Sequence, residues 1–340
     1  MSPRQKIRKD FVPCDEQMRL WPPVSGNTIN GVGETECRRP SPVYWHPPDM
    51  TPHGKLQVWM MEQGLRAPAL HAQRQARAEV IARQPAEIAP QRVERDAGAN
   101  AREVKEQARS FGAQLVGVTR TDPEWVYLGY EFDYPWLVLL GVAMDYEGLK
   151  TAPEVTAAMA VVDGYTNGWR AAQPLADHIR RLGWRAEPRG GPPAGPINLI
   201  PAALACGFGE LGKHGSIING ELGSSFRLAA VFTDLPLTED GPTDIGADDF
   251  CLNCQVCVDA CPVDAISNEK QMVRGVFKWS VDFDRCLPYF NENYGCAVCI
   301  AVCPWSVPGR SPRLTEKMLR RRQRHAARGA SPERPPSHEQ

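Results

Sequence analysis

The pattern of apolar and polar positions predicts a mixed α and β domain in the middle of the chain. Residues 101–111 form a helix candidate that stops at Gly112. Apolar runs at 113–119 and 136–142 predict two strands, and the run at 226–234 predicts a third.

A long helix is predicted between the second and third of these strands. Over 161–182, apolar residues recur at spacings of three and four, at Val161, Tyr165, Trp169, Ala172, Ala176 and Ile179. Gly183 supplies the C-terminal stop, and Pro174 is expected to kink the helix. The segment that follows, P-R-G-G-P-P-A-G-P at 188–196, predicts a loop.

The two ends of the chain differ from this core. The chain has 31 prolines, and their frequency at 1–70 predicts an irregular arm, whose aromatic residues favour wrapping around the core. Residues 311–340 are basic and polar, and we expect them to be a disordered tail. Between these ends, we predict a core domain at 71–240 and a cysteine-rich module at 241–310.

Charge and hydropathy exclude two broad classes. With 39 basic and 40 acidic residues the net charge is -1, which disfavours a general nucleic-acid binder because such proteins neutralise phosphates. The longest apolar run, at 134–144, is too short for a membrane-spanning helix, which needs about 20 residues. Arg38 and Arg39 are followed by Pro40 and not by an apolar stretch, so we recognise no export signal and expect a cytoplasmic protein.

The cysteines carry the strongest chemical signal. The chain has 11 cysteines, and most of them lie between residues 251 and 303. The first run reads C-x2-C-x2-C-x3-C-P from Cys251 to Pro262, which is the spacing of bacterial two-cluster proteins. The second run reads C-x2-C-x3-C-P from Cys296 to Pro304, with Cys286 upstream of it.

This spacing predicts two [4Fe–4S] clusters that share the two runs. Three closely spaced cysteines wrap one cluster, and the fourth, followed by proline, ligates the other. Cluster one is therefore assigned to Cys251, Cys254, Cys257 and Cys303, and cluster two to Cys261, Cys286, Cys296 and Cys299. A disulfide framework suits a short secreted chain, and zinc sites need paired C-x2-C knuckles, so both alternatives are disfavoured.

The residues ahead of the clusters are expected to hold the electron acceptor. Residues 207–216 read G-F-G-E-L-G-K-H-G-S, where so many glycines indicate tight turns or close approach of the backbone to another group. The segment contains G-x-G-x-x-G, but no clear strand precedes it, so a dinucleotide site is only weakly supported.

Several motifs together resemble one family. The segment G-F-G-E-L-G-K-H-G-S-I-I at 207–218, F-R-L-A-A-V-F-T-D-L-P-L at 226–237 and C-I-A-V-C-P-W-S at 299–306 are similar to the core of reductive dehalogenases, as is the approach to the first cluster at 244–254. The resemblance covers about residues 100–310. It implies an α+β fold, with a nitroreductase-like corrinoid-binding core followed by a bacterial ferredoxin-like two-cluster module.

The resemblance also implies an activity. Relatives of this kind remove halide from organohalides with a cobalt corrinoid that receives electrons from two [4Fe–4S] clusters. The sequence has no D-x-H-x-x-G pattern, so the cobalamin is expected to be base-off and without a histidine ligand. An external low-potential donor such as ferredoxin or flavodoxin is implied, and no nucleic-acid partner or membrane span is expected.

The resemblance assigns roles to individual residues. Tyr165 matches the family's proton donor, and Arg227 matches a basic position whose guanidinium favours the phenolate. The alternatives are a core aromatic for Tyr165 and a surface strand residue for Arg227. Corrinoid contacts are expected from Gly209, Gly212, Lys213, His214, Gly215 and Ser216, although His214 is equally consistent with local hydrogen bonding. Asn198 is of uncertain equivalence to an asparagine that shapes the substrate pocket in some relatives.

Two other functions remain open. An epoxyqueuosine reductase-like enzyme would share both cofactors, use an aspartate as its acid and bind tRNA; Asp163 and Asp177 lie near Tyr165 in the sequence. A ferredoxin-like electron carrier would bind iron and sulfide but no corrinoid. Retention of tRNA and the presence of cobalt are the observations that separate these three.

Overall fold

The computed structural model describes residues 10–192 and 195–327 of the chain. Within these residues no helix is long and apolar enough to cross a membrane. The central domain is built on a four-stranded sheet in the order β1-β2-β6-β3, and all three pairings are antiparallel. Its strands are β1 (Leu115–Arg120), β2 (Trp136–Ala143), β6 (Phe226–Thr233) and β3 (Ala186–Gly190).

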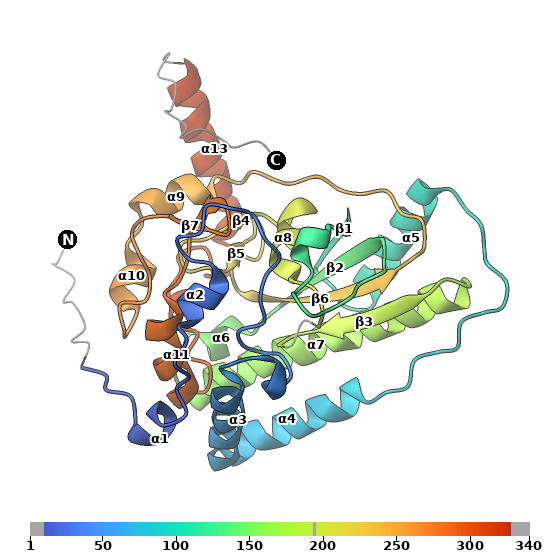
Figure 1. Ribbon diagram of the computed structural model, residues 1–340. Coiled ribbons are helices and arrows are strands. Elements are labelled where there is room, and N and C mark those ends of the chain that lie inside the picture. Colours follow the sequence, from blue (N-terminus) through green and yellow to red (C-terminus); the bar gives the residue numbers. More distant parts are fainter. Residues whose placement is uncertain (1–9, 193–194, 328–340) are drawn as a thin grey trace.

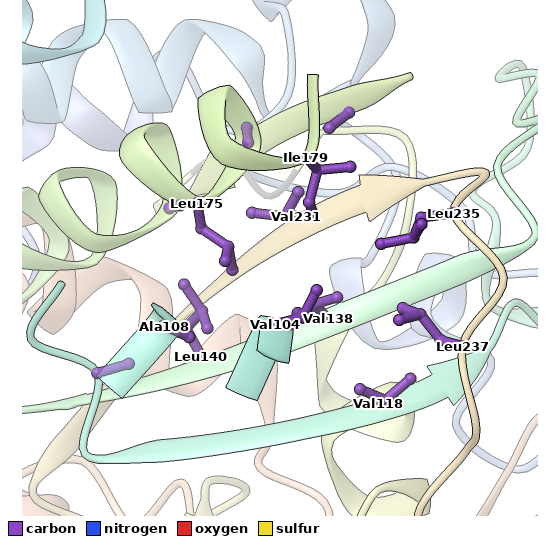
Figure 2. Close-up of a cluster of buried hydrophobic side chains, with 14 of the residues drawn as sticks. Val104, Ala108, Val118, Val138, Leu140, Leu175, Ile179, Val231, Leu235 and Leu237 are labelled. Carbon is purple, nitrogen blue, oxygen red and sulfur yellow. The ribbon is translucent and has the colours of Figure 1, made fainter. Parts of the chain in front are cut away.

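Two helices cover one face of this sheet. Helix α5 (Ala97–Ser110) and the long α7 (Val155–Arg181) lie on it, and α4 (Pro68–Ile81) lies against α7 (Figure 1). Figure 2 shows their apolar side chains meeting those of the strands, with Leu175 and Ile179 of α7 close to Val231 of β6. All three of these side chains are fully buried, so this layer is the main hydrophobic core.

The opposite face of the sheet packs against α8 (Leu199–Ala205) and the loops around it. Cys206 lies here as a buried apolar residue. Its Sγ would be 2.7 Å from a Cβ placed on Gly117 of β1, so a glycine is required at that point. The hairpin of β4 (Glu210–Leu211) and β5 (Ile217–Ile218) connects this layer to the cysteine-rich module.

The cysteine-rich module consists of short helices and one small hairpin. Helix α6 (Tyr146–Leu149) and the N-terminal part of α7 connect it to the core through shared apolar contacts. The module contains α9 (Ala247–Asn253), α10 (Val256–Ala260), β7 (Gln271–Val273), β8 (Val276–Lys278), α11 (Phe283–Glu292), α12 (Val298–Ala301) and α13 (Ser311–Ala327).

The N-terminal arm wraps around α11. The phenol of Tyr44 donates to Asn291 Oδ1 at 2.7 Å, and the Gln17 amide donates to the carbonyl of Pro288 at 3.1 Å. The arm contains α1 (Asp15–Met18), α2 (Gly26–Asn30) and α3 (Gly54–Gln63), together with short 3₁₀ turns. Its prediction as wholly irregular is therefore wrong for these helical residues.

Two further local predictions need correction. Residues 188–190 belong to strand β3 and not to a loop, because β3 is an edge strand where a proline is tolerated. Residues 311–327 form helix α13 in place of a disordered tail, because Leu314 and Met318 share one face and pack against the module. The rest of the predicted tail, 328–340, lies outside the described residues. Helix α7 continues through Pro174 without a break.

Candidate functional site

The structure brings four thiols together at the first predicted cluster. Cys251 lies on α9, Cys254 caps that helix, Cys257 lies on α10, and Cys303 follows α12. All four line a small, mostly enclosed cavity, together with Lys213, His214, Phe250, Pro304 and Trp305. Residues far apart in sequence therefore converge on one site, in the grouping that the spacing predicts.

The other four cysteines form a second group. Burial raises the pKa of the Cys286 thiol to about 12, and the neighbouring charges of Cys296 and Cys261 raise it further. Burial also raises the pKa of Cys299 well above its ordinary value, again with contributions from Cys296 and Cys286. Cys261, Cys286 and Cys299 pack in one apolar cluster, which also contains Cys257 of the first group, so the two thiol groups are neighbours.

Each group offers four free thiols, which is the ligand set of a cubane iron–sulfur cluster. Among residues 10–192 and 195–327, no three His, Cys, Asp or Glu side chains are placed to hold one ion. Backbone amides also point at the sulfurs, from Lys213 to Cys251 at 3.5 Å and from Ala265 to Cys261 at 3.3 Å.

The glycine-rich segment lies beside the first thiol group. Lys213 is 1% exposed, and its Nζ donates to the carbonyl of Cys254 at 2.9 Å and lies over the Trp279 ring. Burial lowers the pKa of His214 to about 4, and its Nε2 lies 3.2 Å from Ser224 Oγ. The structure thus places both side chains at the cysteine cavity.

The glycines of this segment allow close approach of backbone strands. A Cβ on Gly209 would lie 2.0 Å from the carbonyl oxygen of Ile218, and one on Gly212 would lie 2.8 Å from Ile218 Cδ1. Ser216 donates its amide to His214 Nδ1 at 3.2 Å, and Gly215 has a positive φ of 75°. These positions support the β4–β5 hairpin that holds Lys213 and His214.

Tyr165 and Arg227 come together between α7 and the start of β6. The Arg227 guanidinium carbon lies 5.1 Å from the centroid of the Tyr165 ring, in a cation–π arrangement. Arg227 Nε is buried and has no hydrogen-bond partner among the described residues. A Cβ at Gly164 would lie 3.0 Å from Arg227 Cγ, so the glycine lets the arginine cross the helix.

A third residue, Arg77 of α4, was not found from the sequence. Its Nη2 donates to the carbonyl of Gly191, whose own Cα lies against the Tyr165 ring. Burial lowers the pKa of Arg77, and the negative form of Tyr165 opposes that shift. The sequence offers no signal for Arg77, because it stands in a polar helix with several other arginines.

The remaining candidates from the sequence have structural roles. Asn198 is the N-cap of α8, where its side chain accepts from the amide of Ile200 at 3.1 Å. Asp177 accepts from the amide of Ala86 at 2.8 Å and pairs with Arg83. Asp163 is exposed on α7. Neither aspartate therefore lies free and buried beside Tyr165, as the alternative enzyme would need for its acid.

Comparison with known proteins supports this description of the module. Residues 250–307 match the family model of the 4Fe-4S dicluster domain. The matched residues include all eight cysteines of the two thiol groups.

Curated relatives extend the similarity into the core. The tetrachloroethene reductive dehalogenase of Dehalobacter restrictus is 34% identical over 210 residues, covering 57% of this chain and 37% of that protein. The enzyme of the same name from Sulfurospirillum multivorans is 30% identical over 250 residues, covering 60% and 49%. The resemblance to reductive dehalogenases is confirmed. The chain spans less than half the length of these relatives.

A solved reductive dehalogenase, described as suggesting a mechanism for B12-dependent dehalogenation, has a similar fold. It is 26% identical with a TM-score of 0.65, and the alignment covers 74% of this chain and 39% of that one. A catabolic reductive dehalogenase superposes with a TM-score of 0.73 at 23% identity, covering 91% of this chain and 48% of the other. The mixed helix and sheet architecture is thus that of reductive dehalogenases.

Epoxyqueuosine reductases are more distant relatives. The Escherichia coli enzyme is 26% identical over 259 residues, covering 61% of this chain and 65% of that protein. The dehalogenases match at higher identity over a similar length, so the alternative function is supported less.

Proposed function

We propose that this chain carries the catalytic core of a reductive dehalogenase. The reaction consumes an organohalide, two electrons and one proton, and gives the reduced organic product and halide. The proposal rests on the packing of α12, which carries Cys299 of the second thiol group, against α7, which carries Tyr165. Ala301 and Ile300 of α12 share an apolar cluster with Met144 and with Val161 of α7.

In this proposal the eight grouped cysteines hold two [4Fe–4S] clusters. Cluster one is ligated by Cys251, Cys254, Cys257 and Cys303, and cluster two by Cys261, Cys286, Cys296 and Cys299. The clusters would supply electrons one at a time at low potential. The buried surroundings and the amides directed at the sulfurs of Cys251 and Cys261 would tune that potential.

A base-off cobalt corrinoid would supply the two-electron reduction of the carbon–halogen bond. Polar atoms for such a cofactor are present, since Ser225 Oγ and Arg227 Nε are buried without hydrogen-bond partners among the described residues. Gly223 lies against the backbone of Trp305 and Ser306, which brings the chain just before Ser225 next to the residues that follow Cys303. We further propose that the core is nitroreductase-like and that the glycine-rich segment contributes to this cofactor's surroundings.

Tyr165 is the proton donor in this proposal. Its phenol would deliver the proton to the carbon that loses halide, and the phenolate left behind is stabilised by the charge of Arg227 at its ring face. Arg77 holds the Gly191 loop against the ring and so fixes its orientation. The substrate is an organohalide, and the electrons come from an external low-potential protein.

The test compares halide release by the wild-type chain with that of Tyr165→Phe. Both are purified without oxygen after loading with iron, sulfide and cobalamin, and are assayed on halogenated phenols and alkenes. We expect Tyr165→Phe to lower kcat by about 10²- to 10⁴-fold, as for loss of a general acid.

Tyr134→Phe is the matched control. The guanidinium carbon of Arg185 lies 4.8 Å from the centroid of the Tyr134 ring, so this tyrosine also has an arginine over its ring. Tyr134 differs in its location, because it lies in the apolar cluster beneath α8. This variant should retain the wild-type kcat. Equal kcat values for Tyr165→Phe and Tyr134→Phe would show that Tyr165 is not the acid. No halide release by the wild-type chain carrying both metals would contradict the proposed function itself.

A further inference from the structure

A groove of about 970 Å³ lies between α13 and the segment that carries the first cysteines. Figure 1 shows α13 projecting away from the body of the protein beside α9. The wall formed by α13 is strongly basic, with Arg313, Lys317, Arg320, Arg321, Arg324 and His325. The groove is therefore an open surface with one dominant charge.

The carboxylates of the groove do not cancel this charge. Asp249 is paired with Arg322, and Glu316 is paired with Arg320. By contrast, four basic side chains form no ion pair with any residue in the described part of the chain, namely Arg313, Lys317, Arg321 and Arg324. All four are exposed, so their charges face solvent and are accessible to a partner.

The groove reaches the first thiol group. Phe250, Cys254 and Pro304 line both the groove and the cavity that contains the four sulfurs. A protein seated against α13 would therefore bring its own redox centre close to cluster one. Cluster two faces a different neighbour, since α12 packs against α6 and α7.

We propose that this groove docks an acidic, low-potential, one-electron carrier protein, and that cluster one is the entry point for electrons. This inference rests on the proposed function, which requires such a donor. In each encounter the carrier is oxidised by one electron and cluster one is reduced by one, and no bond forms or breaks. The electron then passes to cluster two and toward the α7 side that holds Tyr165.

A nucleic acid is the other polyanion that a basic groove could hold. The observations favour the protein carrier, because the positive charge is concentrated beside a cluster ligand while the whole chain has a net charge of -1. Nucleic-acid binding would not require the groove to include Cys254, which is a ligand of cluster one in the proposed function.

The test measures how fast the clusters of the loaded protein lose their absorbance when mixed with a reduced acidic ferredoxin. The groove variant is the triple change Lys317→Glu, Arg321→Glu and Arg324→Glu. The control variant reverses three exposed charges elsewhere, Lys55→Glu on α3 and Arg102→Glu and Arg109→Glu on α5. Neutral glutamine versions of the groove changes provide a second, milder variant.

At low ionic strength we expect the groove variant to lower the second-order rate constant by at least about tenfold, and the glutamine version by less, because steering of this kind depends on charge. The control should stay within about twofold of wild type. The difference should shrink at about 0.5 M salt. Reduction by methyl viologen radical, a small cation, should not be slowed.

Equal rates for the groove and control variants would overturn the proposal. So would tRNA binding that the groove changes abolish while ferredoxin kinetics stay unchanged. The absorbance is read without organohalide, so the result is independent of halide release. If the protein releases halide with methyl viologen, and the groove changes do not alter the rate constant with ferredoxin, the proposed function stands and the proposed docking site is wrong.

Discussion

At the scale of single residues, the surroundings of Tyr165 depend on two glycines, Gly164 and Gly191, which have no side chain. Gly164 gives Arg227 room to cross α7, and Gly191 brings the loop against the phenol ring. The Arg227 guanidinium lies over the face of the Tyr165 ring. If Tyr165 is the acid, as proposed, its hydroxyl can face a substrate while this charge stays in place.

Substitution of Arg227 tests the electrostatic part of this arrangement. We expect Arg227→Met to lower kcat by about tenfold or more, and Arg227→Lys to recover part of the loss because a positive charge is retained. Halide release at saturating substrate is the measurement. Equal kcat values for the two variants would show that charge is not what Arg227 contributes.

Substitution of Gly191 tests the steric part. A Cβ on Gly191 would lie 2.2 Å from Tyr165 Cε1, so Gly191→Ala should displace the ring and lower kcat. Gly241→Ala is the control, since a Cβ there has no neighbour within 4 Å. Thermal unfolding distinguishes a local from a global effect, because both variants should keep nearly the wild-type Tm if the Gly191 effect is local. Wild-type kcat in Gly191→Ala would mean that the ring position is unimportant.

At the scale of elements, α7 connects the core to the site. Its C-terminal half buries Leu175 and Ile179 on the sheet, while its N-terminal half lies between α4 and the cluster module. The helix is therefore held at both ends, which fixes the position of Tyr165.

Removing a buried side chain from α7 should be costly. Leu175 is fully buried, so Leu175→Ala is expected to lower the free energy of unfolding by about 2–5 kcal/mol. Leu65→Ala, at a side chain that is 57% exposed, should change it by less than about 0.5 kcal/mol. Denaturant unfolding of the cluster-loaded protein gives both values, and similar values would contradict the packing described for α7.

Local sequence patterns explain which elements could be predicted. The strands β1, β2 and β6 and the helices α5 and α7 are uninterrupted periodic runs, and the structure confirms them. Strand β3 was missed because Pro188 and two glycines indicate a loop, and only its pairing with β6 at the sheet edge makes it a strand. Helix α13 was missed because its many charged residues predict a solvated tail, whereas Leu314 and Met318 in fact pack against the module.

In the candidate site too, features set by local sequence could be predicted, and features set by tertiary packing could not. The grouping of the cysteines follows from spacing, because each run is local and the cluster geometry is fixed. Arg77 lies close enough to influence Tyr165 only because α4 packs along α7, and that arrangement is set by tertiary packing. Lys213 and His214 were expected at a corrinoid, but their burial beside the cysteines follows from the β4–β5 hairpin.

At the scale of the whole molecule, the N-terminal arm closes the structure over the cluster module. Its buried His46 lies 3.2 Å from the Tyr130 hydroxyl, and the arm also places Tyr44 against α11. Binding of the arm therefore contributes to the surroundings of the second thiol group.

Acidification should loosen this arm. Burial lowers the pKa of His46 below its ordinary value of 6.5, so the unfolded chain binds the proton more readily than the folded one. The stability contributed by neutral His46 is present above about pH 6.5 and is lost as the pH falls below it. The drop in Tm between about pH 7.5 and 5.5 should be smaller in His46→Gln than in wild type; equal drops would exclude this role for His46.

In the proposed mechanism the two thiol groups and Tyr165 form one reductive pathway. The most direct measurement adds an organohalide to the fully loaded, pre-reduced protein without oxygen, and counts electrons lost and halide released. We expect one halide for every two electrons, with the clusters reoxidised as the organic product forms. Reoxidation of the clusters without halide, in protein containing about eight iron atoms and one cobalt per chain, would contradict it.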